Sequence, residues 1–305
     1  MSSAKGIAIS TDRFAVNSYS TPHNTSIEDI EQVARAEARG VGLWEGKFAD
    51  GEDAAIAEAL AANDVRATFC VPAVHTILPV PFIDASADPV ERTEGICESI
   101  AHLAQFDPLA IVVGPGVSGD PENPIGPIEA IAEALPRIAD VAAEHDQVIT
   151  FELLAQRRGS PLHNLPMIAG FLDEIGRRDI GIMFDVFHSW CEPDLHQHIL
   201  EYGSRINSVH VNDIHPEERT NFDRTMPGDG RGVAAEIIAS LMEAGYDGWW
   251  ELEVFSDDGT YGMELPDSLW KMPHEEMLRQ GKAAFDRVYA EALDILAKRG
   301  VPADR

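Results

Sequence analysis

The sequence predicts an α/β protein built as a single (β/α)8 TIM barrel. A length of 305 residues suits one such barrel, which typically needs about 250 residues plus insertions. Short apolar runs alternate with amphipathic helical patterns along the whole chain, which favours parallel strands joined by helical crossovers. No linker or low-complexity segment interrupts this alternation, so we assign residues 1–305 to one domain.

The expected strands are short and mostly apolar, as is typical of strands buried on both faces in a parallel sheet. They number eight and cover residues 14–17, 41–44, 67–71, 110–114, 148–152, 181–185, 208–211 and 249–254. The alternative, an open doubly wound sheet, often carries G-x-G-x-x-G after its first strand. Nothing similar follows Asn17, so the closed barrel is favoured.

The expected helices lie between these strands. Ser26, with Asp29 three residues later, predicts a capped helix start before an apolar stripe at helical spacing. Comparable helical patterns cover residues 54–62, 89–103, 128–144, 167–177 and 237–242. A C-terminal helical region at 275–299 should complete the ring, and the irregular stretch 255–273 is a candidate lid.

The composition excludes several classes of partner. Asp and Glu number 52 against 23 Lys and Arg, a formal net charge of −29, so we expect no nucleic acid partner. Anionic membrane surfaces would repel this charge, and no segment approaches the roughly 18 apolar residues of a membrane span. The three scattered cysteines indicate a reducing compartment, and we expect a cytoplasmic protein. Analogy with other barrels leaves a homo-oligomer open.

Four consecutive expected strands end in residues that bind metals: Glu152, Asp185, His210 and Glu253. Catalytic residues of TIM barrels lie at these carboxyl ends, and the alternation of side chains would point all four into the barrel mouth. Three carboxylates and an imidazole suit one divalent metal ion, Mn, Co, Mg or Zn. A cation would also relieve the repulsion among the carboxylates.

Other polar residues near these strand ends have expected roles. Glu251 shares a face with Glu253 and could replace it as the fourth ligand, although Glu253 lies nearer the strand end. Asp213, three residues after His210, is expected to orient that imidazole. His188 is expected to hydrogen-bond a substrate hydroxyl, with capping of a loop as the alternative.

Several segments resemble the sugar phosphate isomerase/epimerase family of the xylose-isomerase-like TIM-barrel superfamily. The resemblance rests on the D-x-x-H run at 184–188, the H-x-x-D run at 209–213, the P-G-D-G loop at 227–230 and the last strand at 246–253. Relatives in that family include ketose 3-epimerases, hydroxypyruvate isomerases and inosose dehydratases. The resemblance implies that Glu152 and Glu253 both bind the metal and transfer protons. His75, Trp44 and Trp190 could line the sugar pocket, although each tryptophan could equally belong to the core.

The resemblance implies a divalent-metal-dependent sugar isomerase or epimerase. Its substrate would be a small-molecule sugar, a ketose or keto-polyol, deprotonated to a metal-stabilised enediolate. An inosose-type dehydratase or a C-glycoside-cleaving lyase could use the same site, and a non-catalytic sugar-binding barrel is the alternative of another class. The superfamily also contains endonuclease IV, but the missing basic runs argue against DNA cleavage.

Overall fold

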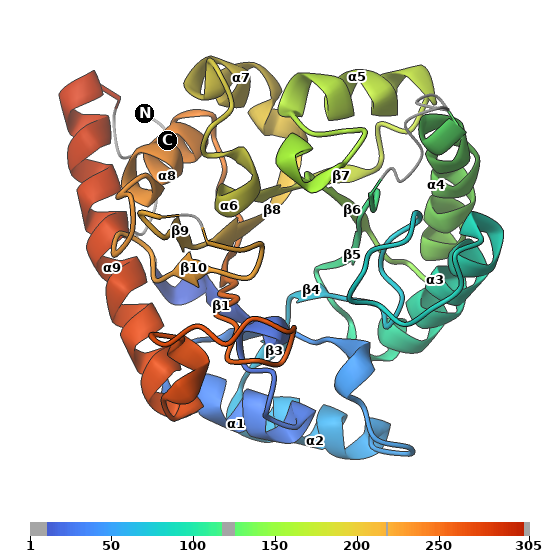
Figure 1. Cartoon of the computed structure of the whole chain (residues 1–305), viewed down its shortest axis with the longest axis horizontal. Coiled ribbons are helices and arrows are strands. Elements are labelled where there is room, and N and C mark those ends of the chain that lie inside the picture. The colour runs from blue at the N-terminus through green and yellow to red at the C-terminus, as the bar shows by residue number, and fades with distance from the viewer. Residues whose placement is uncertain (1–10, 118–125, 218, 302–305) are drawn as a thin grey trace, which may run out of the picture.

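The chain folds as a parallel β-barrel surrounded by helices, as the computed structural model shows for residues 11–117, 126–217 and 219–301 (Figure 1). The barrel strands are β1 (Phe14–Asn17), β2 (Gly40–Gly42), β3 (Arg66–Ala67), β4 (Phe69–Cys70), β5 (Ala110–Val113), β6 (Ile149–Glu152), β7 (Gly181–Asp185), β8 (Ile206–Val211) and β11 (Trp250–Leu252). The prediction of a TIM barrel is confirmed.

The ring closes through a strand that the sequence predicts as continuous, residues 67–71. The strand order is β3-β2-β1-β11-β8-β7-β6-β5-β4, so the first and last barrel strands pair, and the order ends at β3 and β4. These two ends are consecutive pieces of one segment, separated only at Thr68. The Thr68 amide donates to the carbonyl of Val41 and its carbonyl accepts from Leu109, so the backbone still bridges β2 and β5.

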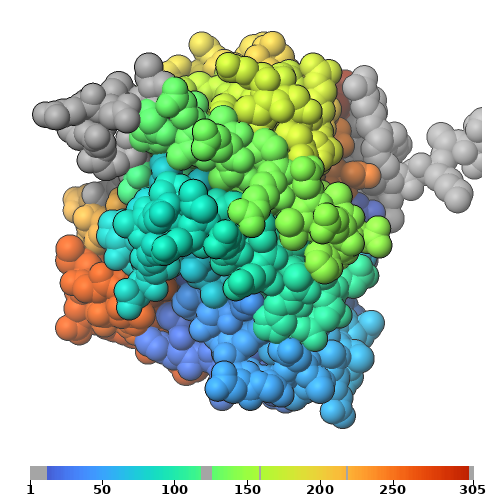
Figure 2. All heavy atoms as spheres, turned by 90° about the vertical axis from the view of Figure 1, so that its right-hand side faces the viewer, coloured from blue at the N-terminus to red at the C-terminus, as the bar shows by residue number. Residues whose placement is uncertain are grey.

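Helices of very different length form the outer layer, except that the buried one-turn helix at 186–189 directly follows β7 at the barrel mouth. They are α1 (Ser26–Arg35), α2 (Asp53–Asn63), α3 (Pro89–Leu103), α4 (Gly126–Glu144), α5 (Leu165–Glu174), α6 (Val186–Ser189), α7 (Leu195–Tyr202), α8 (Ala234–Glu243) and α9 (His274–Arg299). Seen from the side of α3 and α4, this layer covers the sheet (Figure 2). The helical region predicted at 275–299 is confirmed as α9.

The predicted cap of α1 is displaced by one residue. Thr25, not Ser26, is the N-cap: its hydroxyl accepts from the Glu28 amide, and the Glu28 carboxylate accepts from the Thr25 amide. Glu28 stands three residues after Thr25, which is the spacing that a reciprocal capping box requires.

The core lies inside the barrel and between the sheet and its helices. Stacked rings of Phe14 and Phe285, with centroids 4.9 Å apart, join β1 to α9. Gly281 lets α9 approach β11, because a Cβ at this position would lie 2.5 Å from a methyl group of Leu252. No helix in the described ranges is long and apolar enough to span a bilayer.

Two irregular segments lie over the carboxyl ends of the strands. A small hairpin of β9 (Asp213–Ile214) and β10 (Arg224–Thr225) follows β8, and neither strand was predicted. The Arg224 amide donates to the Phe255 carbonyl, which ties this hairpin to the segment after β11 (Figure 1). Parallel strands present their carboxyl ends at one edge, so both segments border the mouth where the polar strand ends meet.

Candidate metal centre

The four predicted ligands converge at the mouth of the barrel. One ligand atom each of Glu152, Asp185, His210 and Glu253 lies within 4.8 Å of the others. The register explains part of this convergence, because Asp185 of β7 and Glu251 of β11 both stand opposite His210 of β8. All four side chains are buried, which removes most of the water that would otherwise solvate their charges.

The orientation of His210 leaves one ring nitrogen directed at the carboxylates. Its Nε2 lies 2.9 Å from Glu251 Oε2 and donates to it, because a carboxylate can only accept. Its Nδ1 faces Glu253 Oε2 at 3.4 Å and Glu152 Oε1 at 3.9 Å. Nδ1 is buried without a hydrogen bond, and Asp185 Oδ2 is held only by an ion pair with Arg224, so the donor set fits a divalent cation bound by one nitrogen and several oxygens.

The geometry separates the roles of Glu251 and Glu253. Both oxygens of Glu251 are already engaged: Oε1 accepts from the Thr68 hydroxyl at 2.6 Å, and Oε2 accepts from Asn17 at 2.9 Å as well as from His210. Glu253 belongs to the cluster instead, which favours it over Glu251 as the fourth ligand.

The prediction that Asp213 orients His210 is wrong. The Asp213 carboxylate accepts from the amides of Ile214, Gly228 and Gly232, so it holds the P-G-D-G loop. Side chains alternate along an extended chain, so residues 210 and 213 face opposite ways. The carboxylate that orients His210 is Glu251, which the strand register places beside it.

Sequence reasoning missed Arg224, a buried cation within the cluster. Its guanidinium lies 3.0 Å from Asp185 Oδ2 and forms a close ion pair with Glu253. The same group lies over the rings of Phe187 and Phe255, 4.7 and 4.8 Å from their centroids. Arg224 lies on β10, in a stretch with no strand periodicity, so no sequence signal marked it.

Burial and neighbouring charges drive the pKa values of the two cluster glutamates apart. Burial, together with the charge of Glu253, raises the pKa of Glu152 to about 8. Burial alone would raise the pKa of Glu253, but His210 and Arg224 outweigh it and hold that pKa below its ordinary value. Without a bound cation, Glu152 thus retains a proton near neutral pH while Glu253 is ionised, and a bound divalent cation would favour the ionised form of both.

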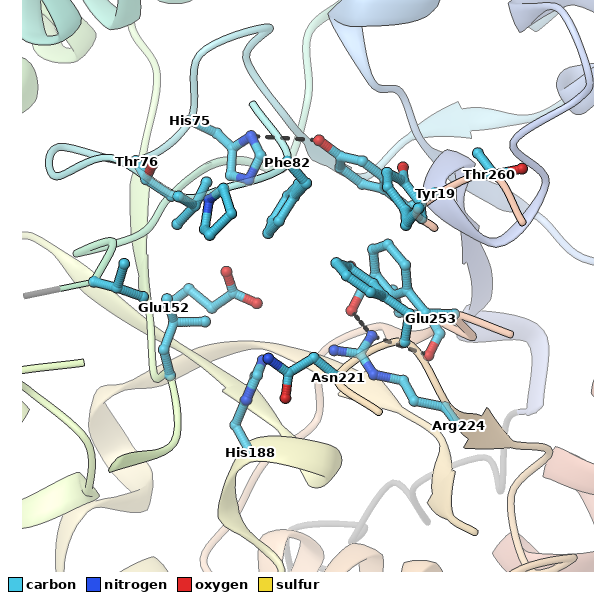
Figure 3. A pocket seen from close by; sticks show the side chains of 17 residues that line it. Tyr19, His75, Thr76, Phe82, Glu152, His188, Asn221, Arg224, Glu253 and Thr260 are labelled. Atoms are coloured by element: carbon cyan, nitrogen blue, oxygen red, sulfur yellow. Dashed lines mark hydrogen bonds and ion pairs between the residues drawn. The ribbon is translucent and has the colours of Figure 1, made fainter. Parts of the chain in front are cut away.

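A cavity of about 620 Å³ lies over the cluster (Figure 3). Glu152 and Glu253 line it, whereas Asp185 and His210 do not. The predicted substrate residues His75 and His188 also line it, together with Arg224. Burial lowers the pKa of His75 to about 4, so its imidazole is neutral.

The two predicted tryptophans do not line this cavity. Trp44 stacks on Tyr19 with centroids 4.3 Å apart, and Trp190 packs under the guanidinium of Arg231. The rings that do line the cavity are those of Tyr19, Phe82, Phe222, Phe255 and Tyr261. Sequence reasoning missed these rings, because most of them come from loops rather than strands.

Residues 30–301 match the family model described as xylose isomerase-like TIM barrel. The chain belongs to this family. Among curated proteins, this family member is 29% identical over 157 residues to a D-psicose 3-epimerase from Enterocloster bolteae, covering 50% of each chain. It is 25% identical over 144 residues to an inosose dehydratase from Geobacillus thermodenitrificans, covering 42% of this chain and 47% of the dehydratase. The chain thus spans about half the length of the curated relatives it matches.

A solved structure described as the IOLI protein with a binding zinc atom superposes with a TM-score of 0.75 at 15% identity. The match covers 92% of this chain and 98% of that one, and it shows the shared fold. The buried group of Glu152, Asp185, His210 and Glu253 could hold a divalent metal ion.

Proposed function

We propose that the chain is a divalent-metal-dependent sugar isomerase or epimerase that acts on a ketose or keto-polyol by proton transfer. One observation carries the proposal. Of the four clustered residues, only the two glutamates also line the cavity, so only they can touch both the ion and the substrate. Family membership and the similarity to a D-psicose 3-epimerase support this class of reaction.

Glu152, Asp185, His210 and Glu253 would hold the ion, Mn, Co, Mg or Zn. When bound, it supplies Lewis-acid polarisation of a carbonyl and so acidifies the neighbouring C–H bond. The set fits this task, because His210 Nδ1 is buried without a hydrogen bond beside three carboxylates.

The two glutamates divide the proton transfer between them. The ionised glutamate accepts the proton from the carbon beside the carbonyl, and the protonated one donates to the resulting enediolate. Both glutamates line the cavity, so both would lie within reach of the reacting carbon atoms of a bound substrate. His188 and Arg224, which line the same cavity, are placed to orient substrate oxygens.

The destination of the returned proton decides the product. Return to the opposite face of the same carbon gives an epimer, return to the neighbouring carbon gives an isomer, and loss of a β-hydroxyl gives a dehydrated product. The curated relatives include an epimerase and a dehydratase, so the assay must detect all three outcomes.

The first test is metal content, followed by solvent deuterium uptake. We expect about one divalent ion per chain by elemental analysis, with loss of the ion in His210→Ala. Metal-loaded protein in deuterium oxide should place deuterium at the carbon beside the carbonyl of a ketose or an inosose, as read by NMR. Glu152→Gln and Glu253→Gln should each lower this uptake by at least about 100-fold, the usual size of an acid–base contribution.

A matched control is Glu276→Gln, which changes a partly exposed glutamate on α9 that does not line the cavity and should leave uptake unchanged. Turnover without deuterium uptake would contradict proton transfer through Glu152 and Glu253 and would favour direct hydride transfer. Absence of bound metal after incubation with all four ions would contradict the proposed enzyme and favour a non-catalytic sugar-binding barrel.

A further inference from the structure

The cavity continues past the ligand cluster along a wall of aromatic rings. Arg224, which pairs with Asp185 and Glu253, lies 4.8 Å from the centroid of the Phe255 ring. From Phe255 the wall continues to Phe222, 5.5 Å away, and from Phe222 to Phe82, 5.4 Å away. The wall therefore begins at the cluster and ends at the cavity rim.

The outer part of this wall is built from two loops and the hairpin region. Phe82 comes from the loop before α3, Phe222 precedes β10, and Tyr261 belongs to the candidate lid at 255–273. The rings of Phe222 and Tyr261 are stacked, with centroids 4.7 Å apart and planes at 17°. The Phe82 ring meets both of them edge-on, at 88° and 75°. Figure 3 shows Phe82 facing the same cavity as Glu152 and Glu253.

These rings form an incomplete aromatic cluster. Phe82 is 38% exposed, although three rings from separate segments surround one side of it, and Phe222 and Tyr261 are only half-buried. Aromatic rings gain by edge-to-face and stacked contacts with another ring, and the open side of Phe82 leaves such a contact unmade.

The size of the cavity agrees with a second group beyond the sugar. A volume of about 620 Å³ lies in the middle of the roughly 300–1,000 Å³ typical of pockets for drug-sized ligands. A single monosaccharide held by Glu152, Glu253 and Arg224 would occupy the polar end and leave the outer rings uncovered.

We propose that the substrate is a keto-sugar that carries an aromatic group, and that Phe82, Phe222 and Tyr261 bind this group. The proposal rests on the function proposed above, because it assumes that the sugar carbonyl lies at the glutamates. The polar end of the cavity then selects the reacting sugar, and the ring wall selects what is attached to it.

The test compares two ethers of one ketose. D-Fructose 6-O-benzyl ether and 6-O-methyl ether share the carbonyl end and differ only in the group attached at the far end. Calorimetric titration of the metal-loaded protein should give a dissociation constant about tenfold lower for the benzyl ether, a gain typical of burying one aromatic ring. Phe82→Ala and Tyr261→Ala should each reduce this ratio to about twofold or less.

The ratio of the two dissociation constants shows whether Phe82 and Tyr261 bind the aromatic group or only support the loops. A general loosening of the loops would weaken both ethers and leave their ratio unchanged. Met263→Ala is the matched control, since Met263 belongs to the same segment as Tyr261, is 48% exposed and does not line the cavity. It should keep the wild-type ratio.

Equal affinity for the two ethers, or no binding of either, would overturn the aromatic subsite. Uptake of solvent deuterium into the same ethers reports separately on the proposed reaction. A tenfold preference for the benzyl ether without deuterium uptake would support the aromatic subsite and contradict the proposed isomerase. Deuterium uptake without that preference would support the isomerase and contradict the subsite.

Discussion

Replacing Glu251 by glutamine would alter the acceptor that orients His210 while keeping the shape of the barrel interior. The Glu251 carboxylate accepts from the Thr68 hydroxyl, from Asn17 and from His210 Nε2, all within 2.9 Å. In the glutamine variant the amide oxygen can still face His210, and the Thr68 hydroxyl can rotate to accept from the new NH₂ group. The variant should therefore fold.

The size of the effect of Glu251→Gln follows from the change in the hydrogen bond that His210 donates to residue 251. A bond to a charged group contributes about 1.5–3 kcal/mol and a neutral one about 0.5–1.5 kcal/mol, so the bond to His210 loses roughly 1–2 kcal/mol. Partners that orient a metal-ligating histidine typically change metal affinity by about 10–100-fold. We expect Glu251→Gln to weaken Mn²⁺ binding within that range while the free energy of unfolding falls by no more than about 2 kcal/mol.

The assay is a calorimetric Mn²⁺ titration paired with urea unfolding. Thr68→Val is the control, because it removes a bond to the other oxygen of Glu251 and leaves His210 untouched. Because this bond also goes to a charged group, the variant should lose about 1.5–3 kcal/mol of stability and keep its metal affinity unchanged. Wild-type affinity in Glu251→Gln, or an equal loss of affinity in Thr68→Val, would refute the orienting role of Glu251.

Three further predictions concern the lid, pH and the loop held by Asp213. Asp257 is buried and accepts from the amides of Gly259, Tyr261 and Met263, so Asp257→Ala should speed limited proteolysis within 255–273 by about tenfold or more. Burial opposes protonation of His102, but hydrogen bonds to Glu45 and Asp53 outweigh it and raise its pKa. Its stabilisation should therefore be full below about pH 6.5 and lost as pH rises through the folded-state value, and His102→Gln should flatten this dependence. The side chain is 35% exposed, so the effect on unfolding free energy should stay below about 1 kcal/mol. Gly230→Ala should destabilise by about 1–3 kcal/mol in urea, because its Cβ would lie 2.2 Å from the Ile214 carbonyl oxygen, whereas Gly170→Ala in the open middle of α5 should stabilise by up to about 1 kcal/mol.

The barrel and the convergence of Glu152, Asp185, His210 and Glu253 could be predicted because both depend on rules that act locally along the chain. A strand buried on both faces is apolar along its length, and a polar residue at its carboxyl end stands out from that background. Parallel strands place those ends at one edge, so Glu152, Asp185 and His210 could be assigned to one site without knowing any distance. The same rule predicts Glu253 as part of the site, although it lies one residue beyond the end of β11.

The partner of His210 could not be predicted in this way. Closeness in sequence favours Asp213, but side-chain alternation from β8 into β9 directs it to the opposite side from His210. Glu251 lies 41 residues further along and reaches His210 only because β8 and β11 pair in one particular register. A shift of that register by one residue would exchange the two faces, and neither strand carries a pattern that specifies it.

Arg224 shows why the other residues of the site could not be predicted from sequence patterns. A buried guanidinium is stable only beside several acceptors, and Arg224 finds them in Asp185 and Glu253, which come from different strands. Its place depends on the β9–β10 hairpin, which is held by the backbone bond from Arg224 to Phe255 rather than by an apolar stripe. The same contact sets Phe255 beneath the guanidinium and so fixes where the aromatic wall begins. The cluster that would transfer protons and the wall that would select the substrate thus meet at Arg224. A change at Arg224 should therefore alter both metal binding and the preference for an aromatic group.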